Sequence, residues 1–273
     1  QAHLRHRAGH ARRFDHVAHL DQRSLVNVGV LVRTGVFNQI VNVHANFTSR
    51  GFILLDKVAT APKDLETTAI RHIGWAGVDG PNEFAWWKAQ GASFHTPLTP
   101  LQQNWFFYIY GPDREIAEVY TGDKNHLFNH VHFSTDDVAA MAGWFEKHLG
   151  MQFPAAAKGP RPADPNARWG SSARVDGVSF VLIYKDHYYA DSEKRLPVGR
   201  KLATTKGSPI DHIAFSYANI QPVFERMRAA GVTILEPIAN RPAHNLKSFF
   251  VQGPDNVVIE IVEAKPIPSG LWE

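Results

Sequence analysis

The chain has 273 residues, 44% of them hydrophobic and 20% charged, a composition typical of globular proteins. The net charge of +3 is small, the basic residues 5–13 lack interleaved aromatic side chains, and no apolar run approaches the ~20 residues of a membrane-spanning helix, so we expect neither a nucleic-acid nor a membrane partner. The absence of cysteine excludes disulfides, thiolate metal sites and cysteine nucleophiles, so any metal must be held by nitrogen and oxygen atoms.

The N-terminal segment shows the weakest pattern of secondary structure. We expect a first strand at residues 14–20 and a closing hairpin at residues 41–48 and 51–55. Residues 25–37 are rich in valine and interrupted by two glycines, and they lack the periodicity of a helix.

Three later segments repeat one order of elements: a strand, a helix and then further strands. The segment that starts at His72 predicts a helix at residues 84–90 and strands at 105–110 and 116–120. The segment that starts at His130 predicts a helix from Val138 to Leu149, because Thr135-Asp136-Asp137 can cap its start, apolar residues recur at helical spacing and Gly150 closes it. It also predicts strands at 173–175 and 178–184. The segment that starts at His212 predicts a helix at residues 220–227 and strands at 234–235, 249–252 and 257–262. The chain therefore contains at least three βαβββ-like modules.

Each of these modules carries a histidine at the same point of its first strand. The phrases are Arg71-His72-Ile73-Gly74-Trp75, Asn129-His130-Val131-His132-Phe133 and Asp211-His212-Ile213-Ala214-Phe215. Two modules also share a Gly-Pro-Asp phrase, which begins at Gly111 or Gly253 and leads to Glu118 or Glu260. Imidazoles and carboxylates at matched positions of a repeat indicate a metal site.

These phrases, together with the helix end Trp144-Phe145-Glu146-Lys147-His148-Leu149-Gly150, resemble the vicinal oxygen chelate superfamily. That superfamily includes glyoxalase I, extradiol dioxygenases, fosfomycin-resistance enzymes, methylmalonyl-CoA epimerase and bleomycin-binding proteins. The resemblance covers about residues 66–264 and implies an α+β fold in which tandem βαβββ modules pair into two half-barrel domains. We expect these domains at residues 1–122 and 123–273, with a first module that is poorly defined.

Transferred residue by residue, the resemblance places metal ligands on the first and last strands of paired modules. In the C-terminal pair the expected ligands are His130, His212 and Glu260, and the fourth position falls at Val181, which cannot ligate a metal. The implied cofactor is a divalent metal, with Fe²⁺ or Mn²⁺ favoured over Zn²⁺ or Ni²⁺.

Two other ligand sets stay open. The N-terminal pair predicts a second possible site at His16, His72 and Glu118. If the modules that start at His72 and His130 pair with each other, the site becomes His72, Glu118 and His130, and the short link between them permits this. We interpret His132, which shares a strand face with His130, as a pocket residue.

The type of reaction is left open by the same residues. A set of three ligands without a fourth is more similar to extradiol dioxygenases than to glyoxalase I. Against a dioxygenase, Phe250 stands where those enzymes have a tyrosine. The candidates for a catalytic acid or base are His187, Tyr188 and His244 in loops.

The expected function is a metal-dependent enzyme of glyoxalase or dioxygenase type, acting on a small substrate that chelates the metal through neighbouring oxygens. The alternative is a metal-free binding protein of the bleomycin-resistance type. The sequence is compatible with a homodimer. The chain starts at Gln1 without a methionine, which fits export after signal removal, and a cytoplasmic location stays open too.

Overall fold

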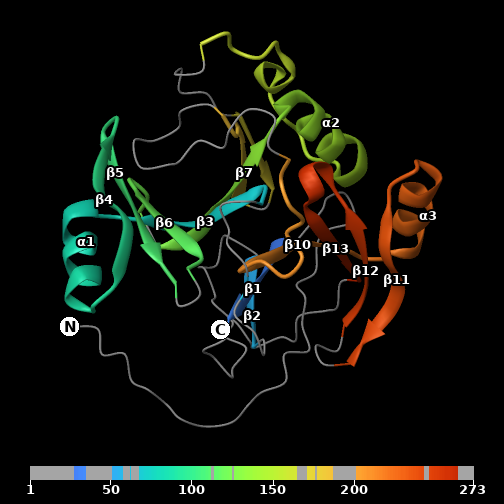
Figure 1. The fold of residues 1–273 in the computed structure, drawn as a ribbon, viewed down its shortest axis with the longest axis horizontal. Coiled ribbons are helices and arrows are strands. Elements are labelled where there is room, and N and C mark those ends of the chain that lie inside the picture. The colour runs from blue at the N-terminus through green and yellow to red at the C-terminus, as the bar shows by residue number, and fades with distance from the viewer. Residues whose placement is uncertain are drawn as a thin grey trace.

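The structure is a computed structural model that describes residues 28–34, 51–57, 62, 68–111, 114–124, 126–164, 171–175, 177–186, 201–242 and 246–263. The candidates His16, His187, Tyr188 and His244 lie outside these residues. The described strands form two sheets, and three α-helices lie along them (Figure 1). None of the described helices has the length and apolar character needed to cross a membrane.

The seven-stranded sheet is built from the modules that start at His72 and His130. The first comprises β3 (Ile70–Gly77), α1 (Gly80–Ala89), β4 (Ser93–Leu101), β5 (Asn104–Tyr110) and β6 (Ile116–Thr121). The second comprises β7 (Leu127–Thr135), α2 (Val138–Leu149), the 3₁₀ helix η2 (Ala155–Lys158), β8 (Ser171–Val175) and β9 (Val178–Tyr184). The strand order is β4-β5-β6-β3-β7-β9-β8, so the two modules join through their antiparallel first strands, β3 and β7.

The six-stranded sheet joins the N-terminal strands to the module that starts at His212. Its strands and helices are β1 (Val28–Thr34), β2 (Gly51–Lys57), β10 (Ile210–Tyr217), α3 (Gln221–Ala229), β11 (Ile234–Arg241), β12 (Leu246–Gln252), the 3₁₀ helix η4 (Pro254–Asn256) and β13 (Val258–Glu263). The order is β11-β12-β13-β10-β1-β2, and the blue β1 and β2 lie beside the orange β10 in Figure 1.

Two strands of the N-terminal region are described, and β1, the one that pairs with the fourth module, lies later than the first strand expected from the sequence. β1 pairs antiparallel with β10, as β3 does with β7, and parallel with β2. It occupies the valine-rich segment 25–37 that lacked helical periodicity, whereas the strand expected at residues 14–20 lies outside the described residues. The strand expected at residues 51–55 is confirmed as part of β2.

The module pairing differs from the expected domain boundary. Residues 122 and 123 lie between β6 and β7, which belong to one sheet, so the second module pairs with the third and the first with the fourth. All modules offer a similar first-strand edge, so the repeat itself does not specify a partner. The α+β fold of tandem βαβββ modules is confirmed, but residues 1–122 and 123–273 do not correspond to the two sheets.

The helix α2 forms where its sequence pattern predicts it. The Asp137 side chain accepts a hydrogen bond from the backbone N of Ala140 (2.9 Å), which caps the helix N-terminus. Gly150 ends the helix with φ 77°, a left-handed conformation that glycine adopts without strain. The face that α2 buries includes Val138, Met141, Ala142, Phe145 and Leu149.

One hydrophobic core joins the two sheets. Phe180 of β9 and Phe215 of β10 are fully buried, and their ring centroids lie 5.6 Å apart. The same cluster includes the buried face of α2 and Val223 and Met227 of α3. The two sheets are therefore parts of one packed unit.

Candidate metal centre

Four buried side chains from three adjacent strands meet in the seven-stranded sheet: His72 on β3, Glu118 on β6, and His130 and His132 on β7. One ligand atom of each lies within 4.8 Å of those of the others. Oε2 of Glu118 lies 2.8 Å from Nε2 of His72 and 3.0 Å from Nε2 of His130. Imidazole nitrogens and a carboxylate oxygen that converge in this way form a donor set for a divalent metal.

Strand register brings these residues together. Across the antiparallel pair, His72 lies opposite His132 and His130 lies opposite Gly74. β6 runs parallel to β3 with Glu118 beside Gly74. A Cβ atom at position 74 would lie 2.0 Å from Cε1 of His130, so the ring of His130 fits only because this residue is glycine.

The pKa values of two members of the cluster are shifted by burial and by their neighbours. Burial raises the pKa of Glu118, but the charges and hydrogen bonds of His130 and His72 outweigh it and hold that pKa well below its usual value. Burial, together with the nearby His72 and His130, holds the pKa of His132 well below its usual value. At neutral pH Glu118 is therefore a carboxylate and His132 a neutral imidazole, the forms in which these groups bind metals.

Tyr108 of β5 lies next to the cluster. It is the cross-strand neighbour of Glu118, it is buried, and its ring centroid lies 4.9 Å from that of His72. Phe250 has the equivalent place in the other sheet, opposite Glu260. The phenylalanine that counted against a dioxygenase therefore belongs to the other sheet, and the cluster has a tyrosine. Alignment of the two Gly-Pro-Asp phrases would have identified Tyr108, because it precedes Gly111 by the same interval as Phe250 precedes Gly253.

The structure does not bring together the favoured ligand set of His130, His212 and Glu260. His212 and Glu260 meet in the six-stranded sheet, where Nε2 of His212 lies 3.3 Å from Oε2 of Glu260. His130 contacts Glu118 in the seven-stranded sheet instead. The alternative set of His72, Glu118 and His130 is the one that assembles, because β3 pairs with β7. Within the described parts of the chain, the group of three or more potential ligands is this cluster with His132 added.

Strand register also shows why the described part of the six-stranded sheet has fewer potential metal ligands. In the seven-stranded sheet, the position opposite Gly74 carries His130 and the position beside Gly74 carries Glu118. In the six-stranded sheet Glu260 likewise lies beside Ala214, but the β1 residues opposite Ala214 and His212 are Gly29 and Leu31, where β7 has His130 and His132. Neither residue has a side-chain ligand atom. At these matched positions of the described strands, the six-stranded sheet therefore has two potential metal ligands, His212 and Glu260.

The pair of His212 and Glu260 forms an ionic contact. Burial lowers the pKa of His212, but hydrogen bonds to Asp211 and Glu260 outweigh it and raise the pKa to about 9. Nδ1 lies 2.8 Å from Oδ1 of Asp211. His212 is therefore an imidazolium at neutral pH, with a carboxylate at each nitrogen.

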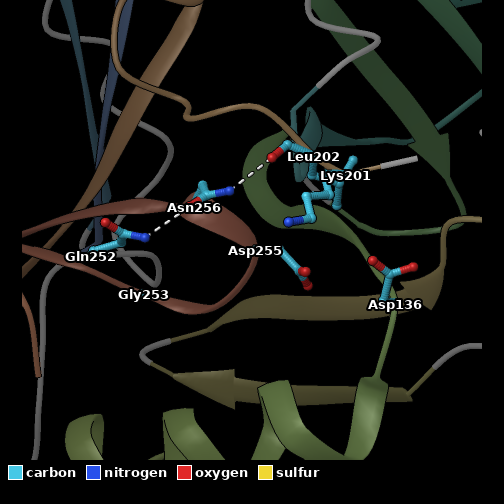
Figure 2. Close-up of a pocket in the computed structure, with 7 residues that line it drawn as sticks. All are labelled: Asp136, Lys201, Leu202, Gln252, Gly253, Asp255 and Asn256. Atoms are coloured by element: carbon cyan, nitrogen blue, oxygen red, sulfur yellow. Dashed lines mark hydrogen bonds between the residues drawn. The ribbon is translucent and has the colours of Figure 1, made fainter. Parts of the chain in front are cut away.

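A separate polar pocket of about 280 Å³ lies at the junction of the two sheets (Figure 2). The side chains of Asp136, Lys201 and Asp255 line it, and Asn256 donates a hydrogen bond to the carbonyl of Leu202 (2.8 Å). Asp255 also accepts a hydrogen bond from the hydroxyl of Thr135 at the end of β7. The Gly-Pro-Asp turn of the fourth module thus contacts the third module, and the pocket is part of that junction.

Comparison with known proteins agrees with this architecture. The family model described as the Glyoxalase/Bleomycin resistance protein/Dioxygenase superfamily matches residues 127–261. Glyoxalase I from Zea mays is 15% identical with a TM-score of 0.62, over 88% of this chain and 92% of that chain. A proposed dioxygenase from Bacillus subtilis subsp. subtilis str. 168 is 10% identical with a TM-score of 0.59, over 89% of this chain and 86% of that chain. No curated protein matches the chain.

At sequence identities of 10% and 15%, the structural similarity shows the fold alone. The family match covers the third and fourth modules, which lie in different sheets, and the cluster takes His72 and Glu118 from outside the matched segment. Sequence signature and fold nevertheless agree: residues 127–261 match the Glyoxalase/Bleomycin resistance protein/Dioxygenase superfamily, and the chain has the fold of glyoxalase I.

Proposed function

We propose that the chain is a metal-dependent enzyme that acts on a small substrate with two neighbouring oxygen atoms. His72, Glu118 and His130 would hold a divalent metal, with His132 as a further nitrogen donor. The observation that carries the proposal is the contact of two buried imidazole nitrogens with one carboxylate oxygen, at 2.8 and 3.0 Å. Fe²⁺ and Mn²⁺ are the favoured metals, and Zn²⁺ or Ni²⁺ would suit the same donor atoms.

His132 is a second potential metal ligand from a module whose strand β9 supplies none at the expected position. On β9, Val181 occupies the position of the fourth ligand, and it lies directly beside His132 in the parallel pair of β7 and β9. The buried, neutral imidazole of His132 thus lies next to the position where a carboxylate is missing. A metal bound here would act as a Lewis acid on the substrate oxygens.

Tyr108 and its neighbours would position the substrate. The phenol of Tyr108 is a hydrogen-bond donor beside His72, suited to a substrate oxygen. Phe106, Tyr108 and Ile116 form a small buried cluster, against which Tyr110 and Tyr120 pack. Apolar and aromatic side chains next to a few polar groups are typical of small-molecule sites. We propose that the half-buried side chains of Tyr110 and Tyr120, which pack on this buried cluster, contact the carbon skeleton of the substrate.

The test is the metal content of the protein, purified without chelator or histidine tag and compared with matched variants. We expect about one metal ion per chain in the wild type and its loss in Glu118→Gln and His72→Ala. The controls, His212→Gln and Glu260→Gln, change the equivalent positions of the other sheet and should retain the metal. Circular dichroism would verify that each variant is folded.

Two results would contradict the proposal. Retention of the metal by Glu118→Gln, with loss in Glu260→Gln, would move the site to the six-stranded sheet. No metal in the wild type, even after anaerobic reconstitution with Fe²⁺, would favour the metal-free binding protein.

A further inference from the structure

The residue before each repeated histidine differs among the three modules, and this difference affects how the imidazole is held. Asn129 precedes His130, Asp211 precedes His212, and Arg71 precedes His72. Oδ1 of Asn129 lies 2.6 Å from Nδ1 of His130, and Oδ1 of Asp211 lies 2.8 Å from Nδ1 of His212. Arg71 has no acceptor atom and cannot make this contact.

An amide oxygen at Nδ1 determines which nitrogen of His130 can bind a metal. The oxygen only accepts hydrogen bonds, so the proton must be on Nδ1. The free electron pair of a metal-binding imidazole is then on Nε2, the atom that faces Glu118 at 3.0 Å. The Asn129 contact therefore selects the tautomer whose available nitrogen points into the cluster.

The ring of His130 lies against Gly74 of the opposite strand, in the place that a Cβ atom would occupy there. The neighbouring rings of His132 and His72 lie at centroid distances of 4.8 and 5.6 Å. Two contacts of the ring are directional, that of Nδ1 with Asn129 and that of Nε2 with Glu118. A metal ion bound at Nε2 would replace the second, so the contact with Asn129 would then set the rotation of the ring about the Cβ–Cγ bond.

We infer that Asn129 is a positioning residue for the metal centre, which holds His130 through Nδ1 so that Nε2 is directed at the metal. The inference rests on the proposed function. Outer hydrogen-bond partners of ligating histidines typically contribute 10–100-fold to metal affinity. The equivalent residue in the six-stranded sheet is Asp211, which is charged. It contacts Nδ1 of His212, whose Nε2 is paired with Glu260.

The experiment titrates the metal-free full chain with Co²⁺ and records the visible absorption, with Zn²⁺ competition to obtain the dissociation constant. Asn129→Leu keeps the approximate size of the side chain but removes the acceptor, and we expect its dissociation constant to rise roughly 10–100-fold with a changed Co²⁺ spectrum. Asn129→Asp restores an acceptor oxygen and should recover most of the affinity and the wild-type spectrum. Asp211→Asn, the matched change in the six-stranded sheet, should bind Co²⁺ as the wild type does.

Wild-type affinity and spectrum in Asn129→Leu would overturn the inference, and so would equal losses in Asn129→Leu and Asn129→Asp. The proposed function fails separately, by the absence of Co²⁺ binding in the wild type or by its persistence in Glu118→Gln.

Discussion

The three repeated histidines have different surroundings although they occupy the same position of the repeat. His72 and His130 share one carboxylate oxygen of Glu118, whereas His212 has a carboxylate at each ring nitrogen. The residue across the strand pair and the residue before the histidine account for the difference. A histidine in this repeat is thus a metal-ligand candidate only where a second module supplies donors.

His212 gives a prediction of pH dependence at the scale of a single residue. Its pKa is raised to about 9 in the folded chain, whereas the unperturbed value is 6.5. Between these values the folded chain retains a proton that the unfolded chain releases, so stability falls as pH rises. The contribution of His212 is complete below about pH 6.5 and is lost as the pH passes about 9.

The measurement is the free energy of unfolding in urea at several pH values from 6 to 10, for the wild type and His212→Gln. We expect a steeper fall in the wild type, by up to about 1.4 kcal/mol per pH unit for one proton. Parallel pH profiles of the two proteins would show that His212 has no raised pKa.

At the scale of elements, local sequence patterns identified helices better than edge strands. α2 has a cap, a continuous apolar face and a terminal glycine, and all three are visible in the sequence. β4 was not predicted, because its sequence Ser-Phe-His-Thr-Pro-Leu-Thr-Pro-Leu contains two prolines. It lies at the edge of the seven-stranded sheet, where a missing backbone N–H is tolerated.

The cap of α2 provides a prediction at this scale. Asp137→Ala removes the acceptor for the backbone N of Ala140, so the free energy of unfolding should fall by about 1 kcal/mol. Asp137→Asn keeps a capping oxygen and should stay close to the wild type in the same urea titration. A loss in Asp137→Asn as large as in Asp137→Ala would mean that the charge of Asp137, and not its hydrogen bond, stabilises the helix.

At the scale of the whole molecule, the two sheets share their largest buried side chains. Phe215 contacts Phe180 across the junction, and Phe180 in turn stacks on Phe133 at a centroid distance of 6.1 Å. Phe215→Ala should lower the free energy of unfolding by about 3–5 kcal/mol, because it leaves a cavity against both sheets.

Hydrogen exchange would show whether both sheets respond to this change. Because the core is continuous, amides of β7 and of β13 should lose protection together in Phe215→Ala. Phe84→Ala is a suitable control, because its ring contacts Phe94 and Phe107 on the α1 side of the seven-stranded sheet. Loss of protection in β13 alone in Phe215→Ala would indicate that the sheets unfold independently.

The sequence by itself determined the modules, the bounds of α2 and the positions of the candidate ligands, because these depend on local periodicity, capping and repetition. Only the tertiary structure decided that His130 joins His72 and Glu118 and not His212 and Glu260. All modules have similar first strands, so pairing depends on which edges meet when the chain folds. That choice is made by the common core and by contacts between residues far apart in the sequence, which no local pattern records.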